Sequence, residues 1–190
     1  MIRVFIYIPT QIKIIFVLNK KYLPLTIEIG KNKIEVILLG ELLKGMQAAK
    51  NQTKKAEEIL KPYGRYFKSP KDKLFLIKQG LKSKAITDLI EITGATQMDV
   101  AHILDLTEPT LRKHIKAGKE LNTGLSEHII QLFELFDKGM DTFGSLEEFK
   151  NWLPTHNLGI NAKPIDLLDT ITGINIVMSE LIRIDFGVTA

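Results

Sequence analysis

The residues from Thr96 to Gly118, TQMDVAHILDLTEPTLRKHIKAG, contain two short helical patterns separated by a turn. Thr96 and Thr107 each precede one pattern and are good N-cap residues, because a threonine hydroxyl can accept a hydrogen bond from the first helical turn. Pro109 suits the first turn of the second helix, where a missing N–H costs nothing, and Gly118 suits its end. This spacing constrains the fold more than any other feature of the chain.

Three apolar positions predict how the two helices pack. Ala101 is a small residue where the second helix would cross the first, Leu106 is apolar in the turn, and Leu111 lies midway along the second helix. The turn needs a residue that tolerates the left-handed conformation, and we expect Asp105 to adopt it. Two short helices joined in this way form a helix-turn-helix.

The outward face of the second helix is basic, which predicts DNA binding. Arg112 is suited to reading guanine, whereas Lys113 and Lys116 are suited to contacting phosphates. The predicted DNA-binding residues are Thr96, Gln97, Thr107, Glu108, Thr110, Arg112, Lys113 and Lys116. The alternative is a plain pair of packed helices with a solvated basic face.

Charge is distributed unevenly along the chain. Residues 1–84 carry 18 Lys and Arg against 6 Asp and Glu, a net of +12, while residues 85–190 carry 8 against 16, a net of −8. Such asymmetry is typical of a protein with an anionic partner at one end and a different partner at the other. A solvated lysine-rich surface would give the same totals.

Several chemistries are excluded or disfavoured. The chain has no cysteine and its four histidines show no metal-ligand spacing, so we expect no disulfide, thiol nucleophile or metal site. No nucleophile elbow, phosphate-binding loop or dinucleotide fingerprint is present. We therefore expect a cytoplasmic protein that is not an enzyme and needs no cofactor.

The N-terminal extension, residues 1–45, is unusual. Its first 18 residues are apolar, but Pro9, Gln11 and Lys13 interrupt them, which argues against a signal peptide or a spanning helix. Residues 26–39, TIEIGKNKIEVILL, alternate like a short β-hairpin. Met46 opens a plausible alternative start, and we hypothesise that the native protein begins there.

The rest of the chain reads as helices separated by glycine and proline. We predict that residues 46–70 form a basic linker with a short helix around Lys54–Leu60. Residues 71–124 are then expected to form a helix-turn-helix domain, and residues 125–190 are expected to form a second helical domain. The helices expected in the last domain are 125–138 ended by Gly139, 145–153 with a capping box, 164–173 ended by Gly173, and 175–186 with Ile176, Val177, Leu181 and Ile184 buried.

The last domain resembles a known family. Residues 143–187, FGSLEEFKNWLPTHNLGINAKPIDLLDTITGINIVMSELIRIDFG, are similar to the toxin-binding domain of the Xre/MbcA/ParS-type antitoxins. The matching residues are Phe143-Gly144, Trp152-Leu153, Leu158-Gly159, Pro164, Leu167-Leu168, Gly173, Val177, Leu181 and Gly187. Residues 106–129 resemble the Xre-type helix-turn-helix that precedes this domain. Ile160-Asn161 stand where the family often has another glycine.

The resemblance implies a mainly α fold, in which an Xre-like helix-turn-helix domain is followed by a small helical toxin-binding domain. It implies an antitoxin of a type II toxin-antitoxin system that covers the active-site entrance of a small toxin, commonly of the NAD-depleting RES type. It also implies that the chain binds its own promoter, usually as a homodimer. The toxin contacts expected by this analogy are Lys163, Arg183, Asp185, Phe186 and Gly187.

Two other interpretations remain open from the sequence. The chain could be a stand-alone helix-turn-helix transcription regulator whose C-terminal domain only dimerises. It could also be a membrane-associated adaptor that uses its apolar first 18 residues, although we expect no membrane association.

Overall fold

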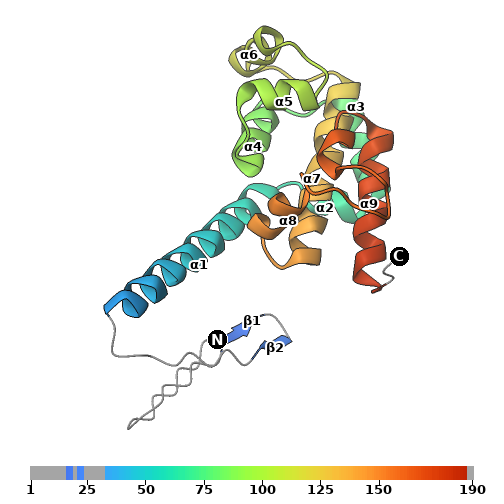
Figure 1. Ribbon diagram of the computed structural model, residues 1–190. Coiled ribbons are helices and arrows are strands. Elements are labelled where there is room, and N and C mark those ends of the chain that lie inside the picture. Colours follow the sequence, from blue (N-terminus) through green and yellow to red (C-terminus); the bar gives the residue numbers. More distant parts are fainter. Residues whose placement is uncertain (1–15, 19–20, 24–32, 188–190) are drawn as a thin grey trace. The chain divides into compact units, whose positions relative to one another are not determined.

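The structure is a computed structural model that describes residues 16–18, 21–23 and 33–187 (Figure 1). The chain divides into two compact units, residues 1–48 and 49–190. In the first unit, β1 (Phe16–Leu18) and β2 (Lys21–Leu23) form an antiparallel pair. The helix α1 (Lys33–Leu60) begins in the first unit and ends in the second.

The structure describes only part of the segment predicted to be a hairpin. Residues 33–39, expected to form its second strand, are the first turns of α1. The run from residue 33 to residue 43 contains no proline, and its leucines and glutamates favour a helix. The alternation of Ile34 and Val36 was too short a pattern to outweigh that preference. Residues 26–32, the other half of the hairpin, lie outside the described residues.

The segment predicted to be a linker is folded. α1 ends at Leu60, as the short predicted helix does, but α2 (Gly64–Lys68) and α3 (Pro70–Gln79) follow almost at once. Leu60 is buried, and Ala56 one turn earlier is buried with it. These apolar residues on the predicted short helix belong to the core, which explains why the segment packs despite its many lysines.

Tyr63 fixes this segment to the rest of the unit. Its hydroxyl donates a hydrogen bond of 2.8 Å to the buried carboxylate of Asp88, and its ring lies 4.5 Å from the ring of Phe133. Burial, together with the hydrogen bond to Asp88, raises the pKa of the Tyr63 hydroxyl far above its ordinary value.

The next three helices agree with the sequence prediction. α4 (Lys84–Thr93) ends at Gly94, whose φ of 66° is left-handed. α5 (Gln97–Ile103) and α6 (Glu108–Ala117) follow, and Gly118, with φ of 62°, ends α6. Each of these boundaries depends on a cap within a few residues, which is why local sequence predicts them.

α7 (Thr123–Phe143) is longer than predicted, because Gly139 lies inside the helix and does not end it. A Cβ atom at Gly139 would lie 2.4 Å from the ring of Phe149. The glycine therefore permits close packing of a neighbouring helix. The helix ends instead at Gly144, whose φ is 79°.

The C-terminal helices also differ in part from the prediction. α8 (Leu146–Trp152) begins with one half of the expected capping box, since the Ser145 hydroxyl accepts a 3.1 Å hydrogen bond from Glu148 N–H. Pro164–Leu167 forms only a short 3₁₀ helix, η1, and α9 (Ile171–Asp185) begins soon after it.

Gly173 therefore lies in the first turn of α9 and does not end a helix. A Cβ atom there would lie 1.9 Å from the Leu167 carbonyl oxygen, so close packing again explains the glycine. Val177 and Leu181 are buried as expected, but Ile176 is exposed and Ile174 is buried in its place. Ile174 lies one turn before Val177 on the same face of α9, and the prediction omitted it because it began the helix at Asn175.

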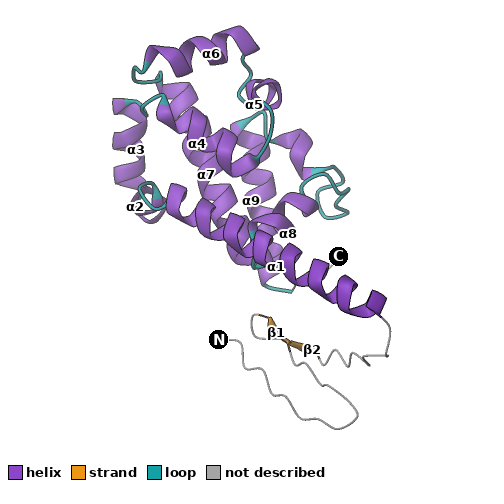
Figure 2. Cartoon of the chain, turned by 90° about the vertical axis from the view of Figure 1, so that its left-hand side faces the viewer, coloured by secondary structure: helices purple, strands orange, loops and turns teal. Residues whose placement is uncertain are grey.

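α7 contacts α3, α4, α8 and α9, so it forms the centre of the second unit (Figure 1). Its fully buried side chains include Ile129, Ile130, Phe133 and Leu135. Apart from the two short strands, the described residues form helices and loops, which confirms the mainly α fold (Figure 2). The predicted boundaries at residues 70 and 124 lie inside this second unit. Among the described residues, no helix has the length and apolar content needed to cross a membrane.

Candidate partner-binding surfaces

The turn between α5 and α6 has the geometry that the sequence predicts. Asp105 adopts a left-handed conformation with φ of 51°. Its N–H donates to the His102 carbonyl at 3.0 Å, and the Leu106 N–H donates to the Ala101 carbonyl at 2.8 Å. These bonds satisfy carbonyls at the end of α5 and reverse the chain within a few residues.

Buried apolar residues hold α6 against α5. Ala101 and Leu111 are buried and Leu106 is half-buried, in agreement with the packing expected from their spacing. His114 and Ile115 are both half-buried, so they share the packing position at the end of α6. With Leu111 facing the core, the opposite side of α6 faces solvent.

Threonine caps fix the starts of both helices. The Thr96 hydroxyl accepts a 3.2 Å bond from Asp99 N–H, and the Asp99 carboxylate accepts a 3.1 Å bond from Thr96 N–H. The Thr96 hydroxyl also donates to the Asp99 carboxylate at 2.7 Å, and this bond, together with the one from Thr96 N–H, holds the pKa of Asp99 below its ordinary value. Thr107 caps α6 through the N–H of Thr110 at 3.4 Å, and the two hydroxyls lie 2.8 Å apart. A cap of this kind stabilises a helix by about 1 kcal/mol.

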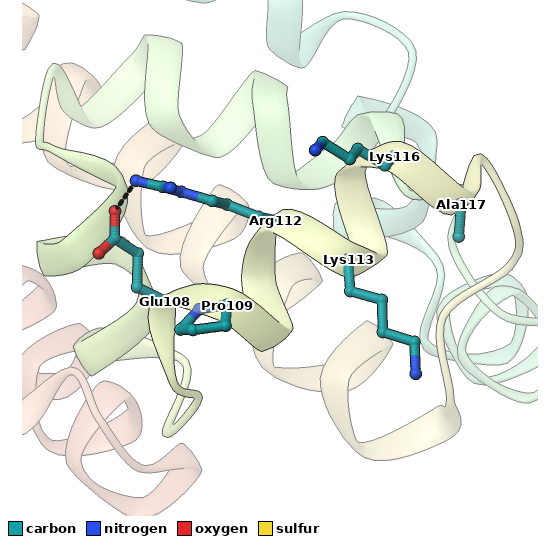
Figure 3. Close-up of a pocket in the computed structure, with 6 residues that line it drawn as sticks. All are labelled: Glu108, Pro109, Arg112, Lys113, Lys116 and Ala117. Atoms are coloured by element: carbon teal, nitrogen blue, oxygen red, sulfur yellow. Dashed lines mark hydrogen bonds and ion pairs between the residues drawn. The ribbon is translucent and has the colours of Figure 1, made fainter.

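The outward side of α6 is a shallow basic hollow (Figure 3). The guanidinium of Arg112 points back along the helix to Glu108 and forms an ion pair with it, while Lys113 and Lys116 extend in other directions. Arg112, Lys113 and Lys116 are all exposed. The residues lining the hollow are Glu108, Pro109, Arg112, Lys113, Lys116 and Ala117.

Of the eight predicted DNA-binding residues, six lie on α6 or at its cap. Thr96 and Gln97 lie at the start of α5, which contacts α6. Met98, beside Gln97 and outside the predicted set, is 65% exposed. Its position outside the apolar face of α5 was the sequence signal for this exposure. That these residues bind DNA stays a prediction.

The predicted toxin contacts fall into two groups. Lys163, Phe186 and Gly187 are exposed, and Phe186 shows 79% of its surface to solvent. Arg183, which is half-buried, and Asp185, which is exposed, form ion pairs within the chain, with Glu180 and Lys138 respectively. The ion pair with Lys138 holds the pKa of Asp185 below its ordinary value.

Glu180 is a buried carboxylate, only 3% exposed, on α9. Arg183 donates to it twice, from Nε at 2.7 Å and from Nη2 at 2.6 Å, and Asn157 donates from Nδ2 at 2.8 Å. The hydrogen bonds from Arg183 hold the pKa of Glu180 below its ordinary value, against the opposing effect of burial. The ion pair therefore ties α9 to the loop that begins at Asn157.

Sequence reasoning missed the exposed apolar residues around α9. Leu158 is 82% exposed in the loop, and Ile176 and Ile182 on α9 are each 43% exposed. Ile176 and Gly159 line one shallow groove between the loop and the helix. Leu158 stands between Asn157 and Gly159, two residues typical of turns. A leucine in a turn does not belong to the apolar face of a helix, and this position was the sequence signal for its exposure.

Comparison with known proteins identifies the C-terminal domain. A family model described as the antitoxin Xre/MbcA/ParS C-terminal toxin-binding domain matches residues 138–187. The chain is also 29% identical over 136 residues to a protein of Sphingobium sp. (strain YBL2) named "Prs ADP-ribosylating antitoxin". That alignment covers 66% of this chain and 85% of the relative.

Both matches are to antitoxins, in agreement with the expectation that the chain is not an enzyme. The family model covers Leu158, Glu180, Arg183 and the rest of α9, so the groove described above lies within the matched domain. These findings support an antitoxin of the Xre/MbcA/ParS type, with a cognate toxin as the partner of the domain at residues 138–187.

Proposed function

We propose that this antitoxin neutralises its toxin by direct binding through the C-terminal domain and represses its own operon through α5 and α6, as a homodimer in the cytoplasm. The observation that carries the DNA-binding half is the outward face of α6, where Arg112, Lys113 and Lys116 are exposed opposite the buried Leu111. The toxin-binding half is supported by the family match over residues 138–187.

The chemistry of α6 fits a helix in the major groove. A helix-turn-helix presents the N-terminal part of its second helix to base edges, and Glu108 and Arg112 lie on that part. An arginine can donate two hydrogen bonds to guanine, and a lysine can neutralise a phosphate. On this account Arg112 contributes sequence preference, while Lys113 and Lys116 contribute affinity.

A RES-type toxin that depletes NAD is the partner that the family resemblance favours, with its active-site entrance covered by the antitoxin. The relative's name includes the term ADP-ribosylating, which supports a second candidate, a toxin that transfers ADP-ribose. Expression of the toxin alone distinguishes the two. The first predicts collapse of cellular NAD without a modified target, and the second predicts an ADP-ribosylated product.

Co-expression tests the proposed function. The protein encoded by the gene adjoining this one should stop growth when produced alone, and growth should return when the full-length antitoxin is produced with it. A harmless neighbour that never co-purifies with the chain would contradict toxin neutralisation. That result would favour a stand-alone transcription regulator.

DNA binding is tested separately with the chain's own promoter. The full-length protein should shift a duplex of that promoter more strongly than a scrambled duplex of equal length. The double variant Lys113→Ala, Lys116→Ala should lose the shift and still neutralise the toxin. Equal binding of both duplexes by the unmodified chain would contradict specific repression.

A further inference from the structure

The loop that carries Leu158 is held rigidly by its own hydrogen bonds. Asn157 N–H donates to the Ala162 carbonyl at 2.9 Å, and Ile160 N–H donates to the Asn157 side-chain oxygen at 3.1 Å. Asn161 adopts the left-handed conformation, with φ of 50°, which closes the loop. Leu158 therefore projects from a loop with a defined shape.

A second set of bonds fastens this loop to α9. The Asn157 side chain donates to Glu180, whose carboxylate also accepts two bonds from Arg183. Gly159 lies directly against the pair, since a Cβ atom there would be 2.4 Å from Arg183 Nη2. Because Glu180 is buried, loss of a partner would leave its charge poorly compensated, so the arrangement resists opening.

Exposed apolar side chains lie on the loop and on α9. Leu158 is 82% exposed on the loop, Ile176, which lines the groove, is 43% exposed, and Phe186 at the end of α9 is 79% exposed. A single exposed leucine on a mobile loop would need no explanation. A leucine held outward by a buried ion pair is different, because ordering it in advance lowers the entropic cost of binding.

Two pairs of charges on α9 and its neighbours are already compensated within the chain. Arg183 is paired with Glu180, and Asp185 is paired with Lys138. A partner that covers these two pairs therefore gains little from their net charge. This property contrasts with the exposed lysines of α6, for which binding depends on counterion release.

We propose that Leu158 is the apolar anchor of the toxin contact and that the Glu180–Arg183 pair is a positioning device that presents it. The partner is the toxin, offering an apolar hollow to the leucine, and the proposal rests on the proposed function of toxin binding. Arg183 thus acts through Leu158 and not by contacting the toxin. Association at this face should depend only weakly on salt.

The test measures affinity between the full-length antitoxin and the protein encoded by the adjoining gene. Leu158→Ser should weaken the complex by about 30-fold or more, the loss typical of an interface hot spot. Leu74→Ser, which alters a leucine that is 53% exposed on α3, is the matched control and should bind within about twofold of the unmodified chain. Both positions are exposed, so both variants should remain folded.

A double-mutant cycle tests the positioning role. Arg183→Ala alone should weaken binding and should increase hydrogen exchange at residues 158–160, because the loop loses its fastening. In a chain that already carries Leu158→Ser, Arg183→Ala should weaken toxin binding only slightly further. Additive losses would mean that Arg183 contacts the toxin directly, which would overturn the positioning role.

The outcomes separate the inference from the function on which it rests. If the unmodified chain does not bind the neighbour, the proposed function fails. If the unmodified chain binds and Leu158→Ser binds equally well, the anchor is wrong while toxin binding stands. A dissociation constant that rises more than about 100-fold between 50 mM and 200 mM salt would also overturn the apolar contact, since that dependence is typical of many released counterions.

Discussion

The ring of Phe149 on α8 occupies the space beside Gly139 on α7, so that a Cβ atom at Gly139 would lie 2.4 Å from it. Phe149 is fully buried, and its ring also lies 5.2 Å from that of Phe136 in an edge-on arrangement. The close approach of the two helices depends on the missing side chain. α8 lies within residues 138–187, which match the antitoxin family model, so this contact helps to define the core of the matched domain.

Gly139→Ala should destabilise the protein by about 1–3 kcal/mol, because the added methyl group overpacks the core. The matched control is Gly124→Ala in the first turn of the same helix, where the nearest atom to a new Cβ is Asn122 Oδ1 at 3.7 Å. That change should be neutral or stabilising by up to about 1 kcal/mol. Urea unfolding of both variants checks the prediction, which fails if their stabilities change alike.

Tyr63→Phe should destabilise the protein by about 1–3 kcal/mol, because it removes a hydrogen-bond donor from the buried carboxylate of Asp88. Tyr66→Phe is the control, since the Tyr66 hydroxyl accepts a bond only from Arg65 at the exposed surface. Its effect should stay within about 0.5 kcal/mol. Equal effects in thermal unfolding would show that the segment after α1 is not anchored through Tyr63.

Glu180 predicts a specific pH dependence of stability. Its pKa is lowered in the folded state by the hydrogen bonds from Arg183, so its contribution is fully present above its ordinary pKa of 4.5. The contribution is lost as the pH falls below that value toward the folded pKa. The stability gap between the unmodified chain and Glu180→Gln should therefore be constant above pH 6 and shrink below pH 4.5. A gap that widens on acidification would contradict this sign.

Salt dependence distinguishes the roles of the α6 side chains. Lys113→Ala and Lys116→Ala should each reduce the slope of log affinity against log salt by about 1, since each would remove one phosphate contact. Arg112→Ala should reduce the free energy of binding to the promoter by about 1–3 kcal/mol, and should reduce binding to a scrambled duplex by less. Lys163→Ala, in the toxin-binding domain, is the control and should change neither quantity. Fluorescence anisotropy at several salt concentrations gives these slopes.

Local sequence was sufficient for the features that depend on local chemistry. The caps at Thr96 and Thr107, the end of α6 at Gly118 and the left-handed Asp105 were all predicted correctly. Each involves groups only a few residues apart, so the residue types alone carry the information.

The failures share a different cause. Gly139 and Gly173 were taken as helix ends, although each provides room for a residue brought close by the tertiary fold. The pairing of Asp185 with Lys138, 47 positions earlier, was likewise not foreseen, and the predicted toxin contact at Asp185 stays a prediction. A single sequence contains no sign of such distant pairings, so the surface of α9 could not be assigned from the sequence.

The central claim is that one chain holds its toxin and its promoter on separate surfaces, around α9 and along α6. The most direct test is a titration of the labelled promoter duplex with the full-length antitoxin that has been saturated with the protein encoded by the adjoining gene. We expect a ternary complex that is larger than the antitoxin–DNA complex. The double variant Lys113→Ala, Lys116→Ala should form no complex with the DNA. Leu158→Ser should form only the binary antitoxin–DNA complex. If the toxin displaces the DNA, and if the α6 variant and the Leu158 variant each weaken the binding of both partners equally, the two partners share one surface. That result would contradict the claim of separate surfaces.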